Sequence, residues 1–312
     1  MKKSLRLAAG ALVALSVLGT GVRGAVASAS HPTAYTYTQI TDPVDPTFNQ
    51  ALGINNAGVV AGYYGSGADP NHPNQGFTVV PPYGANNFAS ENYPGSIQTQ
   101  VIAVTNNGNT AGFWADANNN NYGFVEWNGV FTSVQNPRTP HKTPHVNQLL
   151  GMNDGGIAVG FYNDGKGNSH PYTYNQATGR FKSLRLPGAT SAQATGSNDK
   201  GDIVGFAVQG GSTQGFLLQG KRLTEFQYSG AAATQAFGVN NSDQIVGTWT
   251  DAGGNVHGFV LTDPTGHAQW QSVSLPGGDT DTFLNGINDK GQIVGFVTSS
   301  PTSSLAYVGS PS

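Results

Sequence analysis

The sequence predicts an all-β fold, a six-bladed β-propeller with four antiparallel strands in each blade. Three observations lead to this prediction. A ten-residue pattern recurs six times at steps of 42 to 50 residues, apolar and polar residues alternate within each unit, and the two ends of the chain carry complementary parts of one unit. Repeats of this length indicate units that bury their apolar faces against their neighbours.

The recurring pattern reads Gly-Ile-Asn-Asp-x-Gly-x-Ile-Val-Gly. Its copies begin at Gly53, Ala103, Gly151, Gly196, Gly238 and Gly286. In each copy Gly-Ile-Asn ends one strand, Asn-Asp-x-Gly turns the chain, and Ile-Val-Gly begins the returning strand. These turn residues tolerate the positive φ that a tight hairpin needs. The second copy departs from the pattern at Ala103 and Thr105, and the fifth has Asp243 in place of glycine.

Two further strands complete each unit. The third strand is centred on a small residue or proline followed by an aromatic residue: Gly76-Phe77, Gly123-Phe124, Pro171-Tyr172, Gly215-Phe216, Gly258-Phe259 and Ala306-Tyr307. The fourth strand is clearest at 131–134, 181–184, 223–226 and 270–273. Four short antiparallel strands in forty-odd residues are typical of one propeller blade.

The two ends of the chain predict how the ring closes. The last unit stops after its third strand, at 305–308, and an unmatched strand over 35–40 stands before the first unit. Counted through the break, the spacing is 44 residues, one more period. We therefore expect strand 35–40 to complete the last blade and protect its open edge. The alternative, an open β-solenoid, needs atypical capping repeats at both ends.

The first residues have the composition of a secretion signal. Lys2, Lys3 and Arg6 precede an apolar stretch over 7–18 that is too short to span a bilayer well. Small-residue cleavage patterns end at Ala27 and Ala29. We expect a signal peptide at 1–29 and a propeller over 30–312, in a protein that is secreted, extracellular or periplasmic and does not insert into a membrane.

Composition excludes several function classes. Without the signal, ten basic residues face 17 acidic ones, whereas nucleic-acid binding needs a basic stripe. The chain has no cysteine, which excludes disulfides, a thiolate nucleophile and cysteine-bound zinc. Charged residues make up 10% of the chain. We expect a monomer that binds a glycan or an extracellular protein and no nucleic acid.

The repeats resemble a known family. The Gly-Ile-Asn-Asp-x-Gly-x-Ile-Val-Gly pattern and His257-Gly258-Phe259 look like the bacterial extracellular HAF repeats, which are named after the His-Ala-Phe found at this place. The resemblance covers essentially all of the chain after the signal. The layout is also similar to NHL repeats, which implies that Gly-Ile-Asn ends the innermost strand and that strand 35–40 is outermost.

Glutamines recur in register on the expected inner strands. Five residues before the pattern's Asn position stand Gln50, Gln100, Gln148, Gln193 and Gln235, with Phe283 in the sixth unit. They would ring the channel mouth on the face that carries the loops. One interpretation is a crown of amides for a neutral polar ligand, a sugar or a peptide. The other is a structural ring in which each amide bridges to a neighbouring backbone.

Aromatic residues open the loops after the second strands. Tyr64, Trp114, Tyr162 and Trp249 each stand near Asn or Asp, a combination that suits sugar recognition because a ring face packs on C–H groups. Packing between blades is the alternative interpretation. Several such sites on one face would bind a polymer by avidity.

Metal binding is not favoured, and we expect no cofactor. Asp116-Ala-Asn118-Asn-Asn120 copies the opening of a calcium-binding loop, but the loop lacks the glycine at its sixth place and the acid at its twelfth.

The principal expectation is therefore a secreted, non-catalytic propeller that binds a glycan or protein through the loop face and channel mouth. The alternative is a polysaccharide lyase or glycoside hydrolase with its site on the same face. For a lyase, the candidates are His141 and His145 in the basic insertion 138–145, with His145 as base and Tyr162 as partner. For a hydrolase, a carboxylate pair could come from the acids of blades one and six: Asp42, Asp45, Asp69, Asp279 and Asp281. Fold alone does not choose between these functions.

Overall fold

The computed structural model describes residues 33–68, 71–277 and 281–312. These residues form β-strands joined by turns and loops, with one short 3-10 helix, η1 (Ala85–Asn87). The expected signal peptide lies outside the described residues. Across the described part of the chain, no helix has the length and apolar character needed to cross a membrane.

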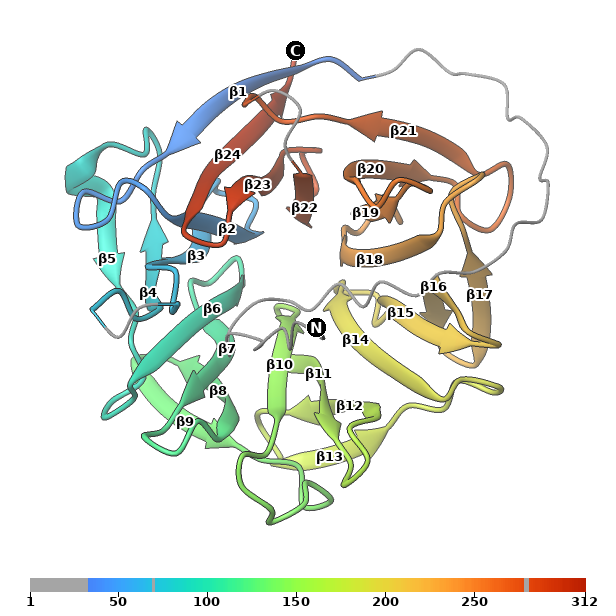
Figure 1. The fold of residues 1–312 in the computed structure, drawn as a ribbon, viewed down its shortest axis with the longest axis horizontal. Coiled ribbons are helices and arrows are strands. Elements are labelled where there is room, and N and C mark those ends of the chain that lie inside the picture. Colours follow the sequence, from blue (N-terminus) through green and yellow to red (C-terminus); the bar gives the residue numbers. More distant parts are fainter. Residues whose placement is uncertain (1–32, 69–70, 278–280) are drawn as a thin grey trace, which may run out of the picture.

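The strands form antiparallel meanders arranged around a central axis, as Figure 1 shows in a view down that axis. Four sheets have four strands, and an eight-stranded sheet consists of two such meanders joined by a single parallel pairing of Thr213 with Ala233. The all-β expectation with four strands in a unit is confirmed.

In the order inner strand to outer strand, the sheets contain the following elements. The first is β2 (Asn49–Ile54), β3 (Val60–Tyr64), β4 (Gln75–Val79) and β5 (Phe88–Ser90). The second is β6 (Gln98–Val104), β7 (Thr110–Ala115), β8 (Asn121–Trp127) and β9 (Val130–Val134). The third is β10 (Asn147–Met152), β11 (Ile157–Asn163), β12 (Ser169–Asn175) and β13 (Arg180–Ser183).

The remaining meanders follow the same order. The eight-stranded sheet contains β14 (Ser191–Ser197), β15 (Ile203–Gln209), β16 (Ser212–Gln219) and β17 (Arg222–Phe226), then β18 (Ala233–Val239), β19 (Ile245–Thr250), β20 (Val256–Thr262) and β21 (Gln269–Val273). The last sheet is β22 (Asp281–Ile287), β23 (Ile293–Ser300), β24 (Ser303–Pro311) and β1 (Tyr35–Ile40).

The closure predicted from the chain ends is confirmed. β1 pairs antiparallel with β24, from Tyr35 opposite Pro311 to Ile40 opposite Ala306. The inner strands also meet: a Cβ on Gly286 would lie 2.9 Å from the carbonyl oxygen of Leu52. The last inner strand is therefore packed against the first, as Figure 1 shows for β22 and β2.

The repeated pattern has the same local geometry in every copy. Its sixth residue has positive φ, and where the fifth copy lacks glycine, Asp243 adopts φ 60°. The register between the inner and second strands shifts by one residue just before the pattern's first position, for example between Ala51 and Gly53. A β-bulge of this kind bends the strand and increases its twist. Ala103 and Thr105 leave this geometry intact, because β6 and β7 carry the same shift.

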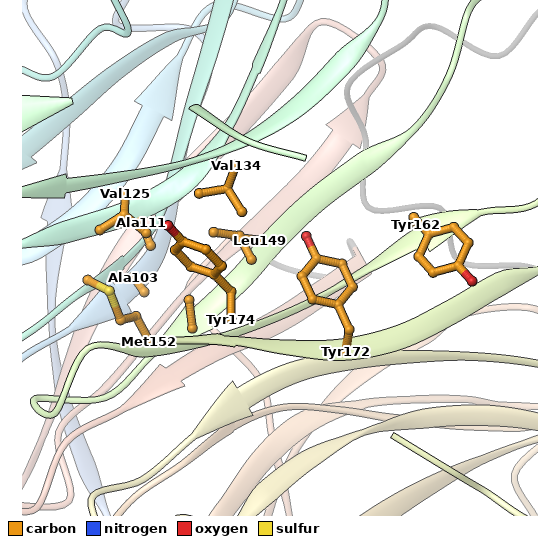
Figure 2. Packing of buried hydrophobic residues seen from close by; sticks show 10 residues of the cluster. Ala103, Ala111, Val125, Val134, Leu149, Met152, Tyr162, Tyr172 and Tyr174 are labelled. Carbon is orange, nitrogen blue, oxygen red and sulfur yellow. The ribbon is translucent and has the colours of Figure 1, made fainter. Parts of the chain in front are cut away.

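Apolar side chains between neighbouring sheets form the core. In Figure 2, Tyr174 of β12 points towards Ala111 and Val125 of the preceding sheet, and Leu149 and Val134 lie beside it. Tyr172 is fully buried, and burial raises the pKa of its hydroxyl far above the ordinary value. Because each sheet contributes one face to such a cluster, no single unit can bury its apolar surface alone.

Candidate binding site

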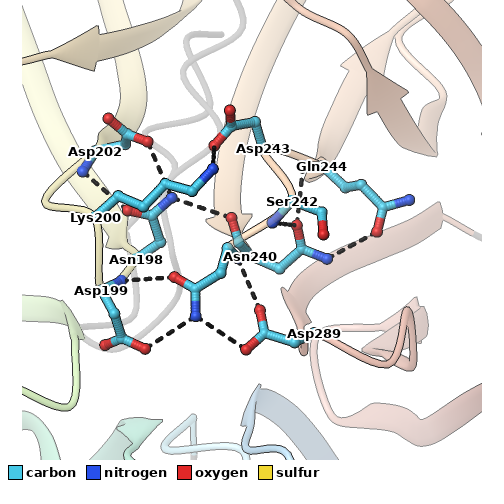
Figure 3. Close-up of polar contacts among 10 residues, drawn as sticks. Asn198, Asp199, Lys200, Asp202, Asn240, Ser242, Asp243, Gln244 and Asp289 are labelled. Atoms are coloured by element: carbon cyan, nitrogen blue, oxygen red, sulfur yellow. Dashed lines mark hydrogen bonds and ion pairs between the residues drawn. The ribbon is translucent and has the colours of Figure 1, made fainter.

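The repeated turns close a ring of hydrogen bonds on one face. The backbone N–H of each residue at the fourth pattern position donates to the side chain of its counterpart in the next repeat, at 2.7 to 2.9 Å. The ring runs through Asn56, Asn106, Asp154, Asp199, Asn241 and Asp289 and returns to Asn56. Figure 3 shows the part between Asp199 and Asp289. The side chains of Asp154, Asp199 and Asp289 therefore act as hydrogen-bond acceptors for backbone N–H groups of the ring.

Two small cavities lie along the channel. One, of about 70 Å³, is lined by the ring of turns, and the other, of about 80 Å³, is lined by inner-strand residues such as Leu52, Ile102 and Phe237. Each cavity is of a size that several ordered waters can fill.

The glutamines in register lie at the junctions between sheets. Gln100 Nε2 donates to Asn74 Oδ1 at 2.9 Å, Gln148 Nε2 to Asn121 Oδ1 at 2.8 Å, and Gln193 Nε2 to Ser169 Oγ at 3.3 Å. Each acceptor stands at the beginning of the third strand of the preceding sheet. Gln50, Gln100 and Gln235 are buried, whereas Gln148 and Gln193 are half-buried. Gln50 accepts a hydrogen bond from the Tyr63 hydroxyl at 2.6 Å.

The aromatic residues that open the loops lie in ring stacks. Trp114 lies between Tyr93, at a centroid distance of 4.4 Å, and Tyr122, at 4.6 Å. Trp249 lies in the same way between Tyr228, at 4.3 Å, and His257, at 4.2 Å. Both faces of these indoles are therefore covered.

The remaining two aromatic residues differ from the tryptophans. Tyr162 is buried and stacks on His170 with a centroid distance of 5.2 Å. Tyr64 is half-buried, and its pKa is raised by burial and then by the charges of Asp42 and Asp45. Neither residue presents a freely accessible ring.

Three loops between second and third strands share one internal arrangement. Asp164 Oδ1 accepts from the backbone N–H groups of Lys166 and Asn168, while Oδ2 accepts from Asn168 Nδ2 and His170 Nε2. Asp116 and Asp251 make the equivalent contacts, with Tyr122 and His257 in the place of His170.

The carboxylates of these loops are held in the charged form. Hydrogen bonds, that of His170 first, hold the pKa of Asp164 well below its usual range. The pKa of Asp251 is lowered first by the side chain of Asn255. Both oxygens of each carboxylate are used within the loop. In the described part of the chain, no three His, Asp or Glu side chains are grouped to hold a metal ion.

The insertion before β10 is tied to its surroundings at several points. His145 Nε2 lies 3.0 Å from Gln135 Nε2, and its ring packs edge-on against Tyr122 at 4.8 Å. Burial, the largest cause, lowers the pKa of His145. His141 is exposed. Tyr162 has its ring contact with His170.

The described carboxylates considered for a hydrolase accept hydrogen bonds from backbone N–H groups. Asp42 and Asp45 are buried, and accept from the backbone N–H groups of Val44 and Thr47. Burial raises the pKa of Asp42. Asp281 accepts from the backbone N–H of Val256 at 2.9 Å. Asp69 and Asp279 lie outside the described residues.

A larger groove lies between β12 and β14 and has a volume of about 350 Å³. We name it the β12–β14 groove. Its lining comes from the start of β12, from the connection that follows β13, and from the start of β14: Ser169, His170, Pro171, Leu184, Arg185, Leu186, Pro187, Ala189, Thr190, Ser191 and Ala192. It opens on the face of the loops between second and third strands, because loop 164–168 leads directly into β12.

Sequence reasoning missed this groove. Its residues belong to three segments that only the fold brings together. One signal was present, however: His170 occupies the same place in its unit as His257 does in the unit on which the family resemblance was based. The groove is of the size usual for small-molecule sites.

Solved structures with the same architecture are known. A putative TolB from Agrobacterium tumefaciens has a TM-score of 0.59 and 11% identity, covering 89% of this chain and 98% of that one. TolB from Acinetobacter baumannii has a TM-score of 0.53 and 11% identity, covering 80% of this chain and 63% of that one. A PL25 ulvan lyase has a TM-score of 0.46 and 14% identity, covering 84% of this chain and 78% of that one, and a similarity of that size carries no argument about activity.

Comparisons at the level of sequence add no family. No family model matches the chain, and no curated protein matches it. The HAF-repeat resemblance therefore stays a prediction from the repeats. At 11% identity the TolB structures show the fold alone, and their function does not transfer. The chain has the β-propeller fold.

Proposed function

We propose that this protein is an exported, non-catalytic β-propeller of six blades that binds a glycan or a protein segment in the β12–β14 groove. The count of six takes the eight-stranded sheet as two blades, because a single residue pair joins its two meanders. The observation that carries the binding proposal is the groove itself: about 350 Å³ on the loop face, against about 70 and 80 Å³ for the channel cavities.

The repeated loop contacts favour binding over catalysis. An Asp–His pair could orient an imidazole as a general base. The same pair recurs at Asp251 and His257, where the imidazole is stacked on Trp249. At Asp116 a tyrosine takes the place of the histidine. A contact that appears in three units with two different side chains serves the loop that all three share.

A steric variant tests the binding site. Thr190 is exposed and lines the groove, and its backbone N–H donates to Val208. Ala232 occupies the equivalent place in the next unit, where its backbone N–H donates to the carbonyl oxygen of Thr250. In the second unit the equivalent residue is Ile97, whose N–H donates to the carbonyl oxygen of Ala115. Because the fold accepts isoleucine at this place, phenylalanine should be tolerated there.

The experiment screens the chain from residue 30 onwards against soluble glycans and cell-envelope fractions. Thr190→Phe should abolish the binding that is found, and Ala232→Phe should leave it unchanged. Binding that survives Thr190→Phe would place the site elsewhere and contradict the proposal. Export has its own test: expression of the full chain should yield a processed protein whose N-terminal residue lies near Ser28 or Ser30.

The second candidate function is a polysaccharide lyase or hydrolase. One observation favours it: His170, paired with Asp164 at 3.0 Å, lines the groove. A lyase would release ultraviolet-absorbing unsaturated ends, and a hydrolase would release reducing ends. Activity on any polymer that is lost in His170→Gln and kept in His257→Gln would replace the binding proposal.

A further inference from the structure

Positive charge is concentrated in one part of this chain. Six of the ten lysines and arginines beyond residue 32 lie between Arg138 and Arg185, a stretch with only two acidic residues. The rest of the chain beyond residue 32 holds four basic and fifteen acidic residues. Such a protein repels anions over most of its surface and attracts them at one place.

The fold brings this charge to the β12–β14 groove. The side chain of Arg185 is exposed and lines the groove. Lys182 is exposed on β13, three residues before it. Arg138, from the insertion before β10, donates from Nη1 to Ser183 Oγ at 3.0 Å, which ties the insertion to the same outer strand.

The groove lining has the chemistry of a sugar site. Leu184, Leu186, Pro187 and Ala189 supply apolar surface for the C–H groups of a sugar ring, and the hydroxyl groups of Thr190 and Ser191 border it. Sequence-independent binding of single-stranded nucleic acid relies on aromatic side chains on which bases stack, and the described lining contains no Phe, Tyr or Trp.

We propose that the β12–β14 groove binds an anionic oligosaccharide, one whose sugar rings carry carboxylate or sulfate groups. The proposal rests on the binding function proposed above and names the ligand class. Arg185 contacts the anionic group directly, because a guanidinium matches the planar fork of a carboxylate and also the oxygens of a sulfate. Lys182 and Arg138 raise the local concentration of the anion through their charge.

The test measures binding of the chain from residue 30 onwards by calorimetry. The probes are oligogalacturonate, which carries carboxylates, dextran sulfate, and neutral dextran, with poly-L-glutamate and single-stranded DNA as polyanions without this chemistry. At least one of the two charged sugars should bind about tenfold more tightly than dextran. The comparison between oligogalacturonate and dextran sulfate identifies the anionic group. Salt at about 0.5 M should weaken this binding, because it screens exposed charges.

Charge variants place the site. Arg185→Gln removes the direct contact and should weaken binding of the charged sugar about fivefold. Lys182→Gln removes a charge beside the groove and should weaken binding by between about twofold and fivefold. Lys221→Gln and Arg222→Gln, exposed at the start of the next outer strand, are matched controls and should change it less than twofold. Arg185→Lys keeps the charge and should retain most of the affinity, which separates loss of charge from loss of fold.

Each contrary outcome has a distinct meaning. If dextran binds as tightly as the charged sugars and its binding is lost in Thr190→Phe, the proposal of an anionic ligand is wrong and the groove remains the binding site. Poly-L-glutamate or DNA that binds as tightly as the charged sugars would show a general polyanion surface and overturn the oligosaccharide. A charged sugar whose binding is unaffected by Thr190→Phe and Arg185→Gln would overturn both proposals.

Discussion

The backbone N–H of Asp289 donates a hydrogen bond of 2.9 Å to Oδ1 of Asn56, and Asn56 Nδ2 donates to Asp289 Oδ2 at 2.8 Å. These two residues are 233 positions apart. Their contact is the step at which the last repeat meets the first, and its backbone hydrogen bond has the same form as those at the five other steps of the ring of turns. The ring therefore closes by repeating one interaction.

Removing this contact should weaken the closure. Asn56→Ala deletes the acceptor for the Asp289 N–H and the donor to its carboxylate, while the backbone remains. We expect a loss of about 1 to 2 kcal/mol in the free energy of unfolding, because partly exposed hydrogen bonds contribute roughly that much. Urea unfolding followed by tryptophan fluorescence measures it. A loss below about 0.3 kcal/mol would show that the closure does not depend on this ring.

The closing strand contributes through its buried end. Ile40 is fully buried in a cluster with Phe77 and Val294, whereas Thr38 on the same strand is exposed. Ile40→Ala should cost about 2 to 5 kcal/mol, the usual range for truncating a buried isoleucine. Thr38→Ala should cost less than about 0.5 kcal/mol. Equal effects of the two changes on the thermal midpoint would contradict the packing described for β1.

The last glycine of each pattern lies against a neighbouring carbonyl. A Cβ on Gly205 would stand 2.0 Å from the carbonyl oxygen of Gln193, whereas one on Gly165 would meet nothing within 4 Å. Gly205→Ala forces the inner strand β14 and the second strand β15 apart and should cost about 3 kcal/mol or more. Gly165→Ala should have little effect. Thermal unfolding of both variants tests this, and a folded Gly205→Ala with an unchanged midpoint would contradict the close approach.

Asp243 tests the backbone of the fifth turn. It adopts φ 60°, and its Oδ1 forms an ion pair with Lys200 Nζ at 3.1 Å. Glycine has no penalty at this φ, whereas alanine has a penalty of about 1 kcal/mol there. Both substitutions lose the exposed ion pair, which is worth about 0 to 1 kcal/mol. Asp243→Gly should therefore be more stable than Asp243→Ala by about 1 kcal/mol in denaturant unfolding. The reverse order would show that positive φ at residue 243 does not decide the relative stability of the two variants.

The loop aspartates predict the direction of the pH dependence. The pKa of Asp164 is depressed in the folded protein, chiefly by the hydrogen bond from His170. Its contribution to stability is therefore present above the pKa of an unfolded aspartate, about 3.9, and is lost as pH falls below that value. The free energy of unfolding should be lower at pH 3 than at pH 6. In Asp164→Asn the difference between the two pH values should be smaller. In His170→Gln the pKa of Asp164, followed by NMR, should rise.

Much of the fold could be predicted because the same turn and strand pattern occurs six times in the sequence. The bounds of β1 and its pairing with β24 followed from counting residues through the chain ends. The common position of the glutamines on the inner strands could also be predicted, because equivalent residues of a repeat occupy equivalent places in the fold. The partners of those glutamines did not follow: Gln148 reaches Asn121, and the direction in which an amide points depends on the neighbouring sheet.

The aromatic residues show a second limit. Trp114 and Trp249 lie within the second strands β7 and β19, one residue before each strand ends. Two of the rings that cover them, Tyr93 and Tyr228, come from connections outside the repeated pattern. Exposure of an aromatic face is a property of the assembled ring, so spacing alone did not reveal it.

The amino-acid sequence by itself determined the all-β fold, the order of strands and the closure of the ring, because hydrophobic alternation and turn chemistry act between residues close in the chain and recur with each unit. Tertiary structure alone decided which surfaces remain open. The β12–β14 groove joins His170, Arg185 and Ser191 from three segments, and whether side chains from separate segments leave a space or fill it depends on packing in three dimensions, which no periodic pattern encodes.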